Sequence, residues 1–280
     1  MIILDGKALS EELIDSVKDK ALKLKPKLAV VLVGENPASL TYVRNKKRAC
    51  ERAGIDYEEL KYPDSITQEE LLKVVDRLNN DDSINGFIVQ APLPDQIRMP
   101  ELIRAINPAK DVDGFHAYNL GKMFINPDFE DLPPATPLGI IKLLDHYDIP
   151  VQGKEVVVVG HSNHVGKPIS TMLLNRNATV TTCHIFTEDL SAHTRRADIL
   201  IVAVGKEKLI TADMVKDGVV VVDVGINRNA EGKLCGDVDF EAISKKASYI
   251  TPVPGGVGPM TIAALILNTI RATERQHADA

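Results

Sequence analysis

The chain has 280 residues, of which 44% are hydrophobic and 26% charged, and its formal net charge is −6. This length accommodates two modest domains, and the composition is ordinary for a globular protein. The acidic balance, the absence of tryptophan and an aromatic share of 4% argue against partners such as nucleic acid or an anionic membrane.

The cysteines and the apolar runs narrow the class of protein further. Cys50, Cys183 and Cys235 lie far apart and form no C-x-x-C pair, which disfavours a disulfide framework or a metal site. No apolar run approaches the roughly 20 residues of a membrane span. The N-terminus turns acidic too early for a secretory signal. We therefore expect a cytoplasmic protein without a bound metal.

In chain order, short β-rich runs alternate with amphipathic helical patterns. The predicted strands are Leu28–Val33, Tyr57–Tyr62, Gly86–Val89, Glu155–Val159, Thr179–Cys183, Ile199–Val204 and Val219–Val224. Helical spacing of apolar residues predicts helices at Gln68–Asn79 and Pro259–Thr273. Nearly continuous valine and isoleucine in the strands is typical of parallel sheets that are covered on both faces. The pattern therefore predicts an α/β fold.

One stretch interrupts this alternation. Residues 111–137 are rich in glycine, proline and asparagine and show no clean periodicity, which is typical of a loop region. A second β-α series follows them. We interpret this stretch as the connection between two domains.

In the first half, a basic helix is predicted at Asn36–Gly54, with asparagine and proline at its start and glycine at its end. Tyr42 and Lys46 are four residues apart and therefore share a face. Lys47 and Arg48 follow at once, and their positive charge should lower the pKa of Lys46. A solvated basic face would explain the same spacing.

Two further polar stretches stand out in the first half. GFIVQAPLP ends a buried strand with Gln90, and KDVDGF places Asp111 and Asp113 before a glycine. A D-x-D-G start suggests a calcium loop, but the twelfth position is Lys122 instead of glutamate, which excludes that interpretation. A structural turn would explain either stretch alone.

A glycine turn follows the strand at Glu155–Val159. Its spacing, Gly160-x-Ser162-x-x-x-Gly166, is one residue longer than the G-x-G-x-x-G of dinucleotide-binding turns and has serine in the middle. Taken alone this match is weak, because every β-α junction of a parallel sheet looks similar. Ser162 can nevertheless donate to a phosphate, and a helix beginning near Gly166 favours anions.

The end of the next strand bears on the choice of cofactor. An NAD site usually has an acidic residue there to hold the ribose 2′-hydroxyl. The run TVTTCHIFT contains no acid, and the first to follow is Glu188. Because a carboxylate would repel a 2′-phosphate, its absence favours NADP, although NAD stays possible. His161 is the only ionisable side chain of the turn that is well placed to help.

Taken together, the motifs resemble the bifunctional methylenetetrahydrofolate dehydrogenase/methenyltetrahydrofolate cyclohydrolase family. The run TPVPGGVGPMTIAALI is similar to the C-terminal signature of that family. The same order of motifs is present along the whole chain: YVRNK, Q-x-PLP, KDVDGF, PATPLGI, VVGHSNHVGKP, VVDVGINR and GDVDF.

The resemblance implies roles for residues in the first half of the chain. Lys46 would be the catalytic lysine, with Tyr42 beside it in the folate cleft and Gln90 as its hydrogen-bonding partner. Asp113 would be the carboxylate that grips the pterin of a tetrahydrofolate derivative. The implied further substrate contacts are Pro254, Gly255 and Gly256.

The resemblance also implies the architecture and the reactions. We expect an N-terminal α/β catalytic domain over residues 1–120, completed by a C-terminal helix at 260–280. A Rossmann-like parallel-sheet dinucleotide-binding domain over 121–259 would follow, with a cleft between the two. The implied enzyme uses NADP to oxidise 5,10-methylenetetrahydrofolate, hydrolyses the methenyl product to 10-formyltetrahydrofolate, and is a homodimer of one-carbon metabolism. The implied cofactor contacts are Gly160, His161, Ser162, Ile185 and Ile226.

Four positions depart from the usual family pattern. Alanine stands at 91 and 135, where leucine and cysteine are usual, and both changes are conservative in packing. His161 and Ile185 stand where many members have arginine, serine or another polar residue near the adenosine phosphate, so the cofactor preference is open. Two other functions stay open as well: a two-domain dehydrogenase of another small metabolite, and a nucleotide-sensing binding protein.

Overall fold

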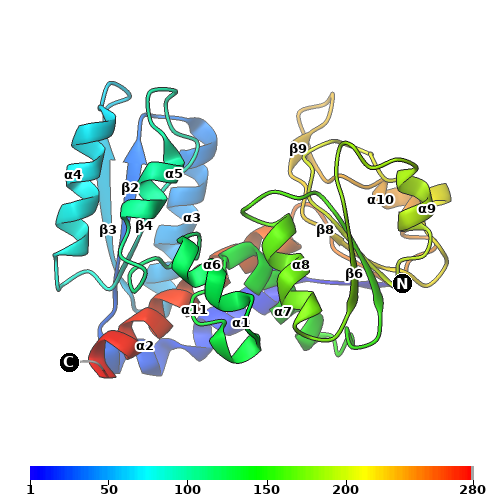
Figure 1. The fold of residues 1–280 in the computed structure, drawn as a ribbon, viewed down its shortest axis with the longest axis horizontal. Coiled ribbons are helices and arrows are strands. Elements are labelled where there is room, and N and C mark those ends of the chain that lie inside the picture. Colours follow the sequence, from blue (N-terminus) through cyan, green and yellow to red (C-terminus); the bar gives the residue numbers. More distant parts are fainter. Residues whose placement is uncertain (279–280) are drawn as a thin grey trace. The chain divides into compact units, whose positions relative to one another are not determined.

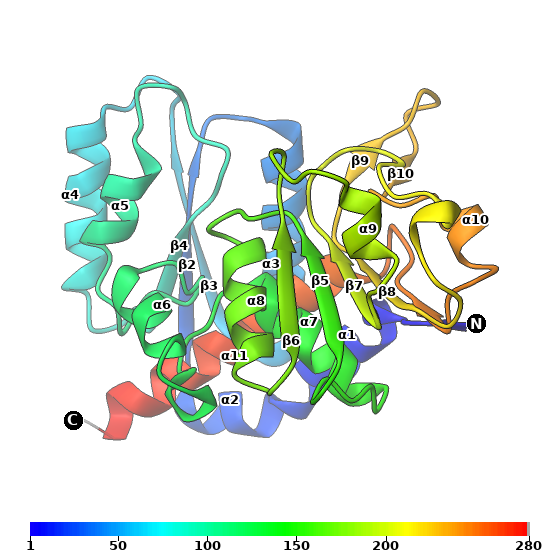
Figure 2. The same cartoon turned by 45° about the vertical axis from the view of Figure 1, so that its right-hand side comes forward.

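The computed structural model describes residues 1–278, which divide into two compact units, and Figures 1 and 2 show their elements. The three-stranded unit contains Glu11–Lys122, Asp128–Ala135 and the chain from Ile262 onward. The six-stranded unit contains Met1–Ser10, Met123–Pro127 and Thr136–Thr261. The last two positions of the predicted range 260–280 lie outside the described residues.

The three-stranded unit is built on a parallel sheet of order β3-β2-β4, with β2 at Lys27–Val33, β3 at Asp56–Tyr62 and β4 at Gly86–Val89. Figure 2 shows α3 on one side of this sheet and α4 and α5 on the other. These helices are α3 at Pro37–Ala53, α4 at Gln68–Asn79 and α5 at Met99–Ala105.

Helix α4 illustrates how the sequence forms this unit. Its buried residues Leu71, Val75 and Leu78 recur at helical spacing and join the core under the sheet. At its start, the Thr67 side chain accepts from the backbone N–H of Glu70, and the Glu70 carboxylate accepts from the N–H of Thr67. This capping box satisfies two backbone donors that would otherwise have no partner in the helix.

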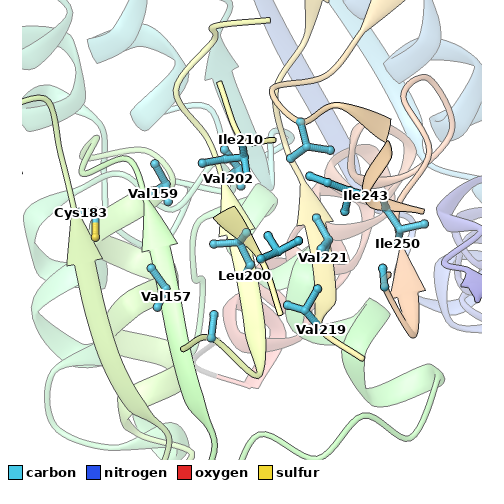
Figure 3. Close-up of a cluster of buried hydrophobic side chains, with 14 residues drawn as sticks. Val157, Val159, Cys183, Leu200, Val202, Ile210, Val219, Val221, Ile243 and Ile250 are labelled. Carbon is cyan, nitrogen blue, oxygen red and sulfur yellow. The ribbon is translucent and has the colours of Figure 1, made fainter. Parts of the chain in front are cut away.

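The six-stranded unit is a parallel sheet of order β1-β11-β8-β7-β5-β6. Its strands are β1 Ile2–Ile3, β5 Glu155–Val159, β6 Thr179–Cys183, β7 Ile199–Val202, β8 Val220–Asp223 and β11 Tyr249–Ile250. Alternate residues of the strands form the buried cluster of Figure 3 together with residues that pack on that face of the sheet, such as Ile243. The strand residues include Val157 and Val159 of β5 and Leu200 and Val202 of β7. Since β6 lies on one side of β5 and β7 on the other, the chain reverses direction across the sheet at β5. In doubly wound folds, ligands bind at this switch point, beyond the carboxyl ends of the strands.

Shorter elements complete both units. They are α1 Gly6–Ser16, α2 Lys18–Leu24, α6 Ala117–Met123, η1 Pro127–Phe129, α7 Ala135–His146, α8 Gly166–Leu174, α9 Leu190–Thr194, η2 Ala212–Met214, β9 Asn227–Arg228, β10 Leu234–Cys235, α10 Phe240–Ile243 and α11 Val257–Ala278. None of the helices among residues 1–278 is both long enough and apolar enough to cross a membrane.

The α/β fold and the parallel sheets predicted from the sequence are confirmed, and all seven predicted strands are present with ends that differ by at most two residues. The absence of regular structure predicted over 111–137 is wrong, because helix α6 and the short helix η1 lie there. Helix α6 carries Gly121 and no apolar stripe, so its sequence gives no periodic signal. Strand β7 ends at Val202, because the two residues beyond it already belong to a loop.

Candidate active site

Helix α3 provides one group of polar side chains in the three-stranded unit. It begins at Pro37, and the backbone N–H of Ser39 donates to Asn36 Oδ1 at 3.4 Å. The helix ends at Ala53, one residue before the glycine that was predicted to stop it. Tyr42 and Lys46 therefore lie one turn apart on an intact helix.

Lys46 is buried, with 9% of its surface exposed, and its amine is held by a short network. Its Nζ donates to Gln90 Oε1 at 2.9 Å. Gln90 Nε2 in turn donates to the carbonyl oxygen of Ala91 at 2.7 Å, so the amide oxygen points at the lysine. The hydroxyl of Ser39 donates to the same carbonyl oxygen at 3.2 Å.

Ser39 is a member of this network that the sequence did not reveal. It is 1% exposed and lies two turns before Lys46 on α3. A signal was available, since seven residues separate the two and place them on one helix face. The hydroxyl of Ser39 donates to the carbonyl of Ala91, which follows β4. Helix spacing alone could not predict that contact.

The electrostatics of Lys46 favour its neutral amine. Burial lowers the pKa of Lys46, and the nearby charge of Asp113 opposes that shift in part. The lowering was predicted from the sequence, but its cause was not. Lys47 and Arg48 are exposed to solvent, and desolvation of the amine is the dominant effect. Burial also raises the pKa of Tyr42.

The KDVDGF loop holds two carboxylates with different surroundings. Asp111 is 2% exposed and accepts from the backbone N–H of Gly114 at 3.1 Å, from that of His116 at 2.8 Å and from Asn119 Nδ2 at 2.9 Å. These bonds make Asp111 the residue that shapes the turn. Asp113 is half-buried, and its charge reaches Lys46. The structure thus brings Lys46, Gln90 and Asp113 together in one unit.

The six-stranded unit carries the glycine turn at its switch point. Gly160 follows β5 with φ +120°, and a Cβ there would overlap the carbonyl oxygen of Ala203. A Cβ at Gly166 would overlap the carbonyl oxygen of Gly160, so the start of α8 packs directly on the end of the strand. Ser162 Oγ accepts from the N–H of Val165 at 3.1 Å, which leaves its O–H able to donate to a ligand.

Two histidines flank this turn. The rings of His161 and His184 have centroids 5.0 Å apart. His184 Nδ1 accepts from the backbone N–H of Phe186 at 3.2 Å. His184 follows β6 directly, at the place where an NAD site usually has its acidic residue. His184 was not among the site residues predicted from the sequence. Beside it, Ile185 is 87% exposed.

The loops after the other strands of this unit expose apolar side chains. Val204, after β7, is 39% exposed, and Ile226, after β8, is 49% exposed. The same unit contains two buried carboxylates, Asp223 and Asp237, which were not among the site residues predicted from the sequence. Burial raises the pKa of Asp223 to about 6. The run Pro254–Gly256 follows β11 in the same unit.

Each group of residues has a distinct chemical capacity. A buried amine with a lowered pKa can accept a proton near neutral pH. A glycine turn that leads into a helix N-terminus can bind a phosphate, and exposed apolar side chains can pack on a flat ring. A pterin offers adjacent N–H donors that a carboxylate can accept together.

The comparisons with known proteins cover both units. The signature of the tetrahydrofolate dehydrogenase/cyclohydrolase catalytic domain matches residues 4–113, and that of the corresponding NAD(P)-binding domain matches residues 134–277. A bifunctional protein FolD of Nautilia profundicola is 54% identical over 279 residues, which are 98% of each chain.

Solved structures of proteins with the same pair of activities are also similar to this chain. The bifunctional methylenetetrahydrofolate dehydrogenase/cyclohydrolase of Campylobacter jejuni has 52% identity and a TM-score of 0.96, and the match covers 99% of both chains. The enzyme of Trypanosoma brucei, solved with NADP cofactor and inhibitor, has 33% identity and a TM-score of 0.93, with 99% of this chain and 98% of that chain covered.

Proposed function

Because this chain belongs to the tetrahydrofolate dehydrogenase/cyclohydrolase family, it is a bifunctional enzyme of folate metabolism, and we propose that Lys46 is the base of its hydrolytic step. It oxidises 5,10-methylenetetrahydrofolate with NADP and hydrolyses the methenyl product to 10-formyltetrahydrofolate. The three-stranded unit is the folate-binding catalytic domain, and the six-stranded unit is the NADP-binding domain. Met1–Ser10, which the sequence assigned to the first domain, belong to the six-stranded unit, because β1 pairs with β11.

The hydrolytic step follows from the chemistry of Lys46. The methenyl carbon of the substrate is cationic, and a water molecule that attacks it must lose a proton. The neutral amine of Lys46 accepts that proton, while Gln90 Oε1 fixes the direction of Nζ. The adduct becomes the formyl group when its bond to the ring nitrogen breaks: the proton held on Lys46 passes to that nitrogen, and the hydroxyl of the adduct releases its own proton to solvent, so that one proton is released overall. The Asp113 carboxylate, together with Tyr42, holds the folate.

The residues at the edge of the six-stranded unit fit NADP. The glycine turn admits backbone close to a pyrophosphate, and Ser162 with the N-terminus of α8 provides donors. Two histidines instead of a carboxylate stand where the 2′-phosphate would lie. Ile226 offers an apolar surface to a ring. When bound, NADP supplies the hydride acceptor, so the dehydrogenase step requires positioning more than proton transfer.

The observation that carries the proposal is the hydrogen bond of 2.9 Å between Lys46 Nζ and Gln90 Oε1. The test is to follow methenyltetrahydrofolate by its loss of absorbance without nucleotide, against a buffer blank for spontaneous hydrolysis. NADPH formation from methylenetetrahydrofolate is measured beside it. A dehydrogenase of another small metabolite, or a nucleotide-sensing protein, would show neither activity.

We propose in addition that the enzyme is a cytoplasmic homodimer that engages neither nucleic acid nor membrane. The sparse free cysteines, with Cys50 and Cys183 buried, are typical of a reducing compartment. The edge strand β1 exposes Ile2 at 48% and Ile3 at 37%, and an exposed apolar edge favours association with another chain. Sedimentation equilibrium tests the assembly, since a species with the monomer mass of 30.6 kDa would contradict it.

A further inference from the structure

The fully buried carboxylate of Asp237 is the meeting point of two loops at the carboxyl edge of the six-stranded sheet. Its Oδ2 accepts from the backbone N–H groups of Val204 at 2.7 Å and Gly205 at 3.0 Å. Its Oδ1 accepts from the N–H of Lys206 and from Asn227 Nδ2, both at 2.8 Å. Three consecutive amides after β7 and one side chain after β8 therefore share one anion, which is the geometry of a backbone anion nest.

A second buried carboxylate, Asp223, fixes the position of the first. Asp223 ends β8 and accepts from the backbone N–H groups of Gly225 at 3.0 Å, Asp237 at 2.9 Å and Val238 at 3.0 Å. The backbone N–H of Asp223 donates to Thr251 Oγ1 at 2.7 Å. Thr251 follows β11 and leads into Pro254–Gly256, the run for which the family resemblance implies contacts with the substrate. The loops after three strands are thus joined by hydrogen bonds through buried groups.

Two glycines show that the backbone is fitted closely around these carboxylates. A Cβ at Gly225 would overlap the carboxylate of Asp237, and a Cβ at Gly236 would overlap that of Asp223. Four N–H donors converge on Asp237, and a buried donor that loses its acceptor is costly. The loops consequently have little freedom to move independently of the carboxylate.

The loops that Asp237 holds belong to one half of the proposed cofactor site. At a switch point, the adenosine half of a dinucleotide lies over the first strand and the end of the second, here β5 and β6. The nicotinamide half therefore lies over β7 and β8. Val204 and Ile226, the partly exposed apolar residues of these loops, are adjacent in sequence to Gly205 and Asn227, two of the donors to Asp237. His161 and Ile185, which belong to the proposed adenosine half, make no hydrogen bond to Asp237.

We propose that Asp237, supported by Asp223, is a positioning residue that sets the nicotinamide half of the NADP site by fixing the loops after β7 and β8. This inference rests on the proposed function, since it assumes that the edge binds NADP. Because Asp237 is fully buried, it acts on the cofactor through the backbone that carries Val204 and Ile226.

The test compares Asp237→Asn with the wild-type enzyme in three measurements. They are the affinity for NADP, the affinity for adenosine 2′,5′-bisphosphate, and methenyl hydrolysis without nucleotide. An amide at position 237 would turn a donor towards Lys206 N–H and Asn227 Nδ2. We expect NADP affinity and dehydrogenase kcat/KM to fall about 10-fold or more, as for buried donors left unsatisfied. Binding of the bisphosphate and the hydrolysis rate should stay within about 2-fold, because neither uses the loops in question.

Further variants keep the outcome decisive if Asp237→Asn folds poorly. Asn227→Ala removes a single donor to Asp237. It should lower the affinity for NADP about 3-fold, as expected for one hydrogen bond, and leave the affinity for the bisphosphate unchanged. Asp217→Asn makes the same chemical change at a side chain that is 87% exposed and serves as the matched control. Equal losses for NADP and the bisphosphate, or unchanged NADP affinity in both variants, would overturn the proposal. A wild-type enzyme that binds no NADP would instead refute the proposed function.

Discussion

The replacement of Gln90 by glutamate tests whether the neutral form of Lys46 is the active one. Gln90 Oε1 accepts from Lys46 Nζ at 2.9 Å, and glutamate keeps the size of the side chain while adding a negative charge at that distance. At an effective dielectric constant of ~20, an ion pair at this separation is worth about 6 kcal/mol. That energy corresponds to an increase of ~4 units in the pKa of Lys46.

Burial of the new carboxylate will offset part of this increase, so we expect a net rise of at least ~2 units. Each unit reduces the neutral fraction of the amine about 10-fold at a pH below its pKa. Methenyl hydrolysis by Gln90→Glu at neutral pH should therefore fall at least ~100-fold, and should recover about 10-fold per unit as the pH is raised. The dehydrogenase rate should change by less than about 10-fold, because hydride transfer needs no proton acceptor.

The assay is a pH–rate profile of methenyl hydrolysis, corrected at each pH for the spontaneous reaction. Gln152→Glu introduces the same charge at an exposed position of the six-stranded unit and is the matched control. A hydrolysis rate close to that of the wild type at neutral pH would refute the requirement for a neutral lysine. A hydrolysis rate of Gln90→Glu that does not rise as the pH is raised would refute it equally, because such a result would point to damaged positioning.

Three further predictions concern the ligands. Asp113→Ala should weaken folate binding by at least about 10-fold and leave NADP binding nearly unchanged, because a charge-assisted contact to the pterin is removed; equal losses in calorimetry would indicate a folding role for the loop. NADP should be used in preference to NAD, because no carboxylate directly follows β6 to hold a ribose 2′-hydroxyl and repel a 2′-phosphate; dehydrogenase assays in which NAD is used as well as NADP would contradict this. Gly166→Ala should abolish NADP binding and lower the thermal midpoint, because its Cβ would overlap the carbonyl oxygen of Gly160; a variant that binds NADP with unchanged affinity would show that the turn can relax.

The parts of the fold that could be predicted are those in which burial leaves a periodic signal. The strands β4 and β5 and the helix α4 have the predicted bounds, because the two strands are buried and almost wholly apolar and α4 has an apolar stripe. Strand β6 also has the predicted bounds, although it is only partly buried, because its residues are mostly β-branched. The strands β1, β9, β10 and β11 have two residues each. A run of that length carries no period, and only tertiary pairing defines it.

The site could be predicted only in part, for a similar reason. Lys46 and Tyr42 are visible through helix spacing, but Gln90 is 44 residues from Lys46 and was connected to it only by resemblance to a family. Asp237 lies in the motif GDVDF, yet its four donors come from two other loops. No local pattern indicates that a loop closes on a carboxylate 31 to 33 residues further along the chain. Contacts of this kind follow from sheet topology, which places the ends of neighbouring parallel strands together.

Methenyl hydrolysis by Lys46→Met tests the central claim most directly, because the substitution removes the amine and keeps an apolar chain of similar length in its buried site. The rate is followed by loss of methenyl absorbance without nucleotide, and binding of tetrahydrofolate and NADP is measured on the same preparation. With Lys46 as the base, both ligands still bind and the hydrolysis rate falls ~100-fold or more. Retention of more than about a tenth of the wild-type rate would contradict the assignment, because a positioned general base contributes at least ~100-fold.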